Sequence, residues 1–222
     1  MSEPPAAERT RVRKSRFTWV RAASDRVPTA WFAAIGTGVF LLATAAFGGL
    51  ATATEPPPPR LNPGAAHVTD MRTLTVQRAV LIDELPGSGT IPDDDERVLA
   101  IVVDVEDNWD RPLRTGGRGS VEESFSVAGL DEPTSSARMD DATIGPTLQP
   151  GVPAQVVYTW AVEADAFAAG DTLVVTLNDM SLYTASFVSK GSSWEDPTPS
   201  ATVTLVLTDV GAGVDAESDD EG

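Results

Sequence analysis

The chain has 222 residues, which suffices for one ordinary domain with appended segments, and its 17 prolines and 18 glycines favour short strands and turns over long helices. It contains no cysteine, so disulfides, a thiol nucleophile and a lipid-modified cysteine are excluded for this sequence. Of the net charge of −17, residues 1–54 contribute +4 and residues 55–222 contribute −21, and this acidic balance argues against binding of nucleic acid.

Residues 1–28 form a basic segment, and residues 29–53 are predicted to form a single transmembrane helix. The 28 residues between Arg26 and Glu55 carry no formal charge. Twenty of them, from Trp31 to Leu50, would extend about 30 Å as a helix, which is the thickness of the hydrocarbon core of a bilayer. Because basic residues precede this stretch, the positive-inside rule predicts a cell-membrane protein with a cytoplasmic N-terminus and an extracytoplasmic C-terminal domain.

A cleaved signal peptide is the alternative to this signal anchor. The triplet Ala51-Thr52-Ala53 has the small-x-small pattern of a cleavage site, which would lie after Ala53. The apolar region of a signal peptide is usually only about 7 to 15 residues long, which favours the uncleaved anchor. Residues 54–67 then form a proline-rich linker, in which Pro56 to Pro59 favour an extended polyproline II conformation.

Residues 68–210 alternate between apolar and polar side chains, a pattern that predicts strands with one buried face. The clearest strand spans residues 198–209, in which one face is formed by Ala201, Val203, Leu205 and Leu207. Further strands are predicted at residues 97–107, 155–163 and 170–179, with weaker candidates at 71–83, 124–130 and 182–189. About seven strands separated by turn-rich stretches predict an all-β fold, an antiparallel immunoglobulin-like β-sandwich. Residues 211–222 are predicted to form an acidic disordered tail.

One residue interrupts the alternation in residues 71–83. Arg78 falls in phase with the apolar residues Leu74, Val76 and Val80. Either a bulge lies at this point, or the second half of the strand is exposed.

The order of the predicted elements is similar to that of a known family. A long strand ends in a turn that contains Asn108, and a Pro-Gly turn at Pro150 and Gly151 leads into the next apolar strand. With the preceding membrane segment and linker, residues 70–210 resemble the DUF4352-type, immunoglobulin-like domains of bacterial exported proteins. This resemblance implies a fold and a location without a mechanism. The lipid-bearing cysteine that usually anchors the family is missing here, where an intact span would serve instead.

A hydrolase with a serine or cysteine nucleophile is not expected. The only histidine, His67, falls in the proline-rich linker, and no Gly-x-Ser-x-Gly motif occurs. A pair of carboxylates acting as acid and base stays open as the enzymatic alternative, although the many acidic residues allow no pair to be chosen. A pocket lined by two or more facing carboxylates would favour this alternative.

The acidic loop, defined here as Asp93, Asp94, Asp95 and Glu96, is the densest acidic cluster between predicted strands. Calcium prefers carboxylate oxygens, so these four residues are weak candidates for a metal site. Their spacing differs from that of an EF-hand, and a solvated turn explains the cluster equally well. A secreted calcium-dependent domain is therefore a third alternative, and no other cofactor is expected.

Trp109 and Trp194 lie in loop-like surroundings. A tryptophan in such a place either anchors a partner or, more often, folds over an open end of its own sandwich. Together these features predict a non-enzymatic, membrane-anchored binding or accessory module whose partner is a membrane protein or a component of the cell envelope.

Overall fold

The computed structural model describes residues 29–46, 56–186 and 191–212. Helix α2 (Thr29–Ala46) lies within the uncharged stretch between Arg26 and Glu55. It has no acidic residue in its first turn and no basic residue in its last. In the described ranges, no helix combines the length and the hydropathy that crossing a membrane requires. Residues 1–28 and 47–53 lie outside these ranges, so the span at residues 29–53 stays a prediction.

The strands belong to a separate compact unit that begins at Pro57. Its described residues include the 3-10 helix η1 (Glu122–Ser124). In chain order its strands are β1 (Arg60–Leu61), β2 (Ala66–Val68), β3 (Arg72–Ile82), β4 (Glu96–Asp107), β5 (Leu113–Arg114), β6 (Phe125–Val127), β7 (Ser135–Arg138), β8 (Thr147–Leu148), β9 (Pro153–Glu163), β10 (Thr172–Ala185) and β11 (Gly191–Gly211).

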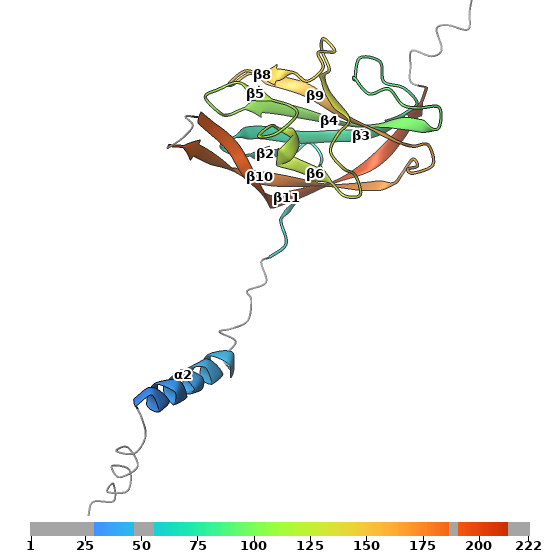
Figure 1. Cartoon of the computed structure of the whole chain (residues 1–222). Helices are drawn as coiled ribbons and strands as arrows, with labels where there is room; N and C mark the ends of the chain where they lie inside the picture. The colour runs from blue at the N-terminus through green and yellow to red at the C-terminus, as the bar shows by residue number, and fades with distance from the viewer. Residues whose placement is uncertain (1–28, 47–55, 187–190, 213–222) are drawn as a thin grey trace, which may run out of the picture. The chain divides into compact units, whose positions relative to one another are not determined.

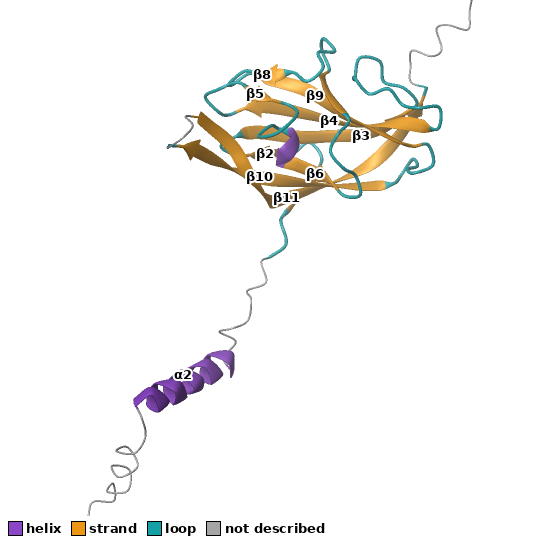
Figure 2. Cartoon of the chain, viewed as in Figure 1, coloured by secondary structure: helices purple, strands orange, loops and turns teal. Residues whose placement is uncertain are grey.

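Nine of the described strands form two layers that share β11, and β5 and β8 pair with each other in a separate two-stranded sheet (Figure 1 and Figure 2). One layer contains β6, β10, β1 and most of β11. The other contains β2, β3, β4, β9 and β7. Residues 191–206 of β11 pair with β10, whereas residues 207–211 pair with β3, so this one strand passes from the first layer to the second. The all-β sandwich expected from the sequence is therefore present.

The prediction of a purely antiparallel sandwich is wrong. Strand β11 runs parallel to both β1 and β3. A tight hairpin forces its two strands to be antiparallel, but β3 ends at Ile82 and pairs with a segment that begins at Leu207. No single turn joins these segments, so the connection leaves their relative direction free. The immunoglobulin-like classification stays a prediction.

The predicted boundaries also change. Residues 60–61 and 66–68, expected in the proline-rich linker, form β1 and β2, so the sandwich begins before residue 68. Residues 182–185, expected to start a separate strand, continue β10. Among the described residues there are eleven strands, where about seven were predicted. Two-residue strands such as β1, β5 and β8 are too short to show a period in the sequence. Of the tail, residues 213–222 lie outside the described ranges.

The irregularity in β3 is a bulge, as one of the two alternatives predicted. The register against β4 shifts between Val76 and Arg78. Before the shift Leu74 and Val76 are buried, and after it Ala79 and Leu81 are buried, while Arg78 is exposed. The extra residue therefore moves an arginine outward and keeps both halves of β3 against the core.

The core lies between the two layers, and the inward faces predicted for the four clearest strands are confirmed. Its residues from β4, β9, β10 and β11 include Leu99, Ile101, Val103, Val105, Val156, Tyr158, Trp160, Val162, Leu173, Val175, Leu177, Ala201, Val203, Leu205 and Leu207. A second, smaller cluster on the outer face of β4 consists of Ala100, Val102, Ala137 and Val157. Strand β4 is therefore apolar on both faces because both are covered.

An ion pair closes the end of the sandwich where β11 meets β3. Arg97 donates from Nη1 and Nη2 to the two carboxylate oxygens of Asp209 at 2.9 and 2.7 Å, and from Nε to Asp83 at 2.7 Å. The hydrogen bonds from Arg97 lower the pKa of Asp209 to about 2. The paired charges thus join β4, the end of β3 and the end of β11.

Neighbouring residues of β11 provide a test of the two faces. Leu205 is 2% exposed and Val206 is 66% exposed. We expect Leu205→Ala to lower the free energy of unfolding by about 2–5 kcal/mol, because it leaves a cavity in the core. Val206→Ala should change that free energy by less than about 0.5–1 kcal/mol. Urea unfolding of both variants checks this, and equal losses would contradict the assignment of the faces.

Candidate functional site

The single histidine lies in the sandwich and not in a linker. His67 is the central residue of β2, and its side chain is 11% exposed. Its Nδ1 lies 3.1 Å from a guanidinium nitrogen of Arg72, and its Nε2 lies 2.9 Å from Ser200 Oγ and 3.4 Å from Asp179 Oδ1. Sequence reasoning missed this cluster because the serine and the aspartate are more than a hundred residues away along the chain.

Arg72 holds the cluster together from the inside of the sandwich. As the first residue of β3 it shares the inward face with Leu74, and it is 0% exposed. Its Nε donates to Ser124 Oγ at 2.6 Å, and its Nη2 donates to the backbone oxygen of Ser124 at 2.8 Å. Burial lowers the pKa of Arg72 to about 10, while Tyr158 and Asp179 act in the opposite direction. The guanidinium is therefore still charged at neutral pH.

The contact with Arg72 decides which nitrogen of His67 carries the proton. A guanidinium only donates hydrogen bonds, so Nδ1 must accept, and the proton of the neutral ring lies on Nε2. Nε2 then donates to Ser200 Oγ, which in turn donates to the backbone oxygen of Leu177 at 3.1 Å. A catalytic histidine needs the opposite arrangement, in which Nε2 accepts the proton of the serine. His67, Ser200 and Asp179 therefore form a structural network and not a hydrolytic triad.

A pocket of about 400 Å³ opens beside this network. Residues of both layers line it, and its apolar wall consists of Phe125, Val127, Leu130 and Trp160. Trp160 Nε1 donates to the backbone oxygen of Asp131 at 2.9 Å, which holds the loop after β6 against the indole. The volume lies within the range of about 300–1,000 Å³ that is typical of small-molecule sites. We call this cavity the β6 pocket.

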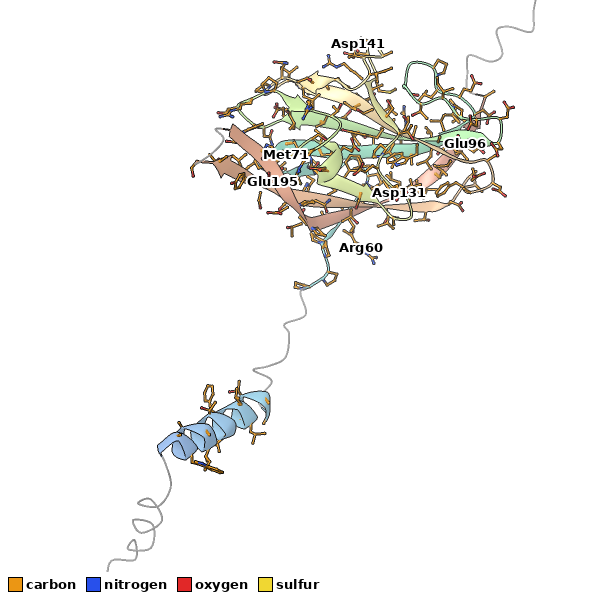
Figure 3. The ribbon with its side chains drawn as sticks, in the orientation of Figure 1. Arg60, Met71, Glu96, Asp131, Asp141 and Glu195 are labelled. Carbon is orange, nitrogen blue, oxygen red and sulfur yellow. The ribbon has the colours of Figure 1, made fainter. Side chains whose placement is uncertain are left out.

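The mouth of the β6 pocket is acidic. Glu122, Glu123, Asp131 and Glu132 line it, and its lining contains no lysine, arginine or histidine. Asp131 belongs to the loop that follows β6 (Figure 3). Burial raises the pKa of Glu122, and the nearby charges of Glu132 and Glu123 raise it further, against a hydrogen bond from Gly117. The carboxylates thus repel one another at the entrance to an apolar cavity.

A glycine-rich turn positions the two glutamates. The backbone N–H of Gly117 donates to Glu122 Oε2 at 3.1 Å, and that of Gly119 donates to Glu123 Oε2 at 2.7 Å. Gly119 has φ +68°, and a Cβ there would lie 3.3 Å from the backbone oxygen of Trp194. A side chain is therefore disfavoured at this position by both conformation and space.

The buried network and the β6 pocket share a wall. Asn178 lines the pocket, and its Nδ2 donates to the backbone oxygen of Glu123 at 3.4 Å. The backbone oxygen of Asn178 lies 3.5 Å from Arg72 Nη2. Arg72 therefore contacts η1, which carries Glu122 and Glu123 of the acidic mouth, and β10, which contributes Asn178 to the lining of the pocket. No motif in the sequence announces this, because Arg72, η1 and β10 lie far apart along the chain.

The acidic loop is a turn in the structure. Glu96 Oε2 accepts a hydrogen bond from the backbone N–H of Asp93 at 3.0 Å, and the N–H of Glu96 bonds back to Asp93 O at 3.0 Å. Glu96 lies toward one end of the sandwich, and Met71, which precedes Arg72 in the chain, lies toward the other end (Figure 3). In the described part of the chain, no three histidine, aspartate or glutamate side chains are grouped so that they could hold a metal ion. Asp93, Asp94, Asp95 and Glu96 thus stay weak metal candidates, without supporting geometry among the described residues.

Trp109 and Trp194 pack against each other. Their ring centroids are 5.9 Å apart at an interplanar angle of 74°. Trp194 belongs to β11 and is 4% exposed, and Trp109 packs against the core. The guanidinium of Arg111 lies 5.3 Å from the centre of the Trp109 ring. Of the two alternatives from the sequence, the one in which these rings fold onto their own sandwich is the one observed.

The network around His67 predicts a pH dependence of stability. Burial lowers the pKa of His67 below its ordinary value of 6.5, Arg72 lowers it further, and Asp179 opposes the shift. Between the lowered value and 6.5 the unfolded chain binds more protons, so the free energy of unfolding should fall as the pH drops below 6.5. Urea unfolding across this range should show the decrease in the native chain and a smaller one in His67→Gln.

The His67→Gln variant serves as the control, because protonation of Asp107 and Glu122 changes the free energy of unfolding in the opposite direction. Burial raises the pKa of both carboxyl groups, so their protonation favours the folded state as the pH falls. The difference between the native chain and His67→Gln isolates the histidine. Since the chain has one histidine, its imidazole NMR signal can be followed directly, and a pKa at or above 6.5 would contradict the network.

Comparison with known proteins gives only distant similarity. No protein-family model and no curated protein sequence matches this chain, so the resemblance to DUF4352-type domains stays a prediction. A "putative lipoprotein" of Bacillus subtilis aligns with 16% identity over 63% of this chain and 37% of its own, with a TM-score of 0.34. A second from Staphylococcus aureus has 9% identity over 66% and 94%, with a TM-score of 0.35.

An uncharacterised β-sandwich protein of Clostridium difficile has 9% identity over 69% of this chain and 99% of its own, with a TM-score of 0.35. Similarity at this level transfers neither a family nor a function.

Proposed function

We propose that this chain is a ligand-binding module of the cell envelope, tethered to the membrane by residues 29–53 and displaying its β-sandwich outside the cytoplasm. The observation that carries the binding function is the β6 pocket, an apolar cavity of about 400 Å³ that residues from both layers line. The residues around it are held by hydrogen bonds, as when Trp160 donates to Asp131 O. A cavity with fixed walls and a few convergent polar groups is what a binding site requires.

The roles of the polar residues support binding over nucleophilic catalysis. The one histidine is committed to Arg72 and cannot take a proton from Ser200 while that contact lasts. The chain has no cysteine that could act as a nucleophile. The described residues therefore fit binding, which does not require a nucleophile or a general base.

The location rests on the sequence. The stretch between Arg26 and Glu55 carries no formal charge and follows a basic segment, which favours an anchor with its N-terminus in the cytoplasm. The partner in this proposal is a membrane protein or a component of the envelope that meets the sandwich outside the cytoplasm.

The β6 pocket also favours a second candidate function, a hydrolase that uses two carboxylates. Four carboxyl groups line its mouth, and the raised pKa of Glu122 is the property that a general acid needs. Against this, Glu122 accepts a hydrogen bond from the backbone N–H of Gly117, which acts to lower its pKa. Recovery of a chemically unchanged ligand from the pocket would favour binding, and recovery of a cleaved one would favour the hydrolase.

The absence of native cysteine allows a direct test of the location. We expect Thr208→Cys, at an exposed position of β11, to react with a membrane-impermeant maleimide in intact spheroplasts. Ser15→Cys, in the basic segment, should react only after the membrane is permeabilised. Labelling of Ser15→Cys alone in intact spheroplasts would contradict the orientation.

Site-specific photo-crosslinking tests the binding function. Ser126 is exposed and lines the β6 pocket, whereas Thr204 is exposed on β11 and does not. With benzoylphenylalanine at position 126, irradiated cells should yield a defined adduct in the membrane fraction. The same group at position 204 should not yield that adduct, and identical adducts from both positions would refute a ligand specific to the pocket.

A further inference from the structure

The β6 pocket combines an apolar interior with an acidic mouth. Its interior is apolar and includes the rings of Phe125 and Trp160, and its mouth carries four carboxylates. An anionic ligand would meet repulsion at the mouth, and a wholly apolar ligand would leave the carboxylates without a partner. The pocket therefore favours a ligand with an apolar body and a positively charged end.

No basic side chain among the described residues forms an ion pair with the carboxylates at the mouth. Among the described residues, the ion pairs are His67–Asp179, Arg97–Asp83, Arg97–Asp209, Arg111–Asp110 and Arg138–Asp140. None of them includes Glu122, Glu123, Asp131 or Glu132. The only hydrogen bonds to Glu122 and Glu123 side chains in this part of the chain come from backbone N–H groups. These carboxylates are therefore available to pair with a cation from outside.

The aromatic residues favour an organic cation over a metal ion. Trp160 and Phe125 have π faces and an apolar surface that a hydrated metal ion would not use. An ammonium or guanidinium group on an alkyl stem places its stem against the apolar wall and its charge at the mouth. The geometry of three acidic side chains that a metal ion would require is not found in the described part of the chain.

Resting on the proposed binding function, we propose that the ligand of the β6 pocket is an organic cation, an ammonium or guanidinium group on an apolar stem. The apolar stem lies along Val127, Leu130 and Trp160, and the charged end meets Glu122 and Glu132. The cation is either a free amine or the side chain of a basic residue presented by a partner. Both sources share this chemistry, and the experiment separates them.

The test uses the full chain in a nonionic detergent, labelled with 5-fluorotryptophan. Its five tryptophans give ¹⁹F signals, and Trp160→Phe identifies the signal of Trp160. We expect n-pentylammonium to shift this signal saturably, and 1-pentanol, which has the same stem without the charge, to leave it unchanged. A blocked Gly-Lys-Gly peptide and its norleucine analogue form the second pair of probes. Saturable binding of either cation supports the proposal, and the one that binds more tightly identifies the source.

Two double variants remove the same number of charges from different places. Glu122→Gln with Glu132→Gln should weaken binding of the cation about tenfold, because both changes remove charge from the mouth. Asp93→Asn with Asp94→Asn, in the acidic loop outside the lining of the pocket, should leave the affinity unchanged. Dispersed ¹⁹F signals show that each variant has folded.

Three outcomes would overturn the ligand class. They are no response of the Trp160 signal to either cation, equal affinity for the neutral analogues, and equal weakening by the two double variants. The photo-crosslinking at position 126 does not depend on the charge of the ligand. An adduct there without a response to cations would refute the organic cation and leave the binding function standing.

Discussion

A charged guanidinium lies inside this sandwich and bonds to both of its layers. Arg72 belongs to β3, while Ser124 precedes β6 and Asn178 lies on β10 of the other layer. An apolar side chain at this position would leave the acceptors of Ser124 and His67 without donors in the interior, at a cost of about 1–3 kcal/mol each. The several donors of the arginine satisfy groups that come from both layers.

This constraint extends to the candidate site. η1 carries Glu122 and Glu123 and ends at Ser124, which Arg72 holds by both its hydroxyl and its backbone oxygen. Asn178 links the same region to the wall of the β6 pocket. The half of the acidic mouth that η1 carries is therefore linked by hydrogen bonds to the buried arginine and to β10.

The structure distinguishes two groups of acidic residues, which have the same kinds of side chain but different surroundings. The acidic loop is a turn in which Glu96 bonds back to Asp93, and a solvated turn explains its charges. The carboxylates at the β6 pocket adjoin aromatic rings and a cavity. Density of charge along the chain pointed to the first group, whereas the second group is distinguished only by what lies next to it in space.

The sequence by itself determined the elements whose signals are local. Period-two alternation identified the inward faces of the long strands, because side chains alternate between the two faces of a strand wherever it lies in the fold. The phase of Arg78 indicated an irregularity in β3, and the register against β4 shows that it is a bulge. The uncharged run before the proline-rich segment is likewise a local pattern. Its role as a membrane anchor remains a prediction from that pattern.

Tertiary structure alone decided the features that depend on long-range contacts. The parallel pairing of β11 with β3, the neighbours of His67 and the lining of the β6 pocket all join residues far apart in the chain. His67 follows four prolines, so its local sequence resembles a linker, and only its pairing opposite Leu74 brings it against Arg72. A local pattern reports the period of a strand, but it carries no information on which distant strand lies beside it.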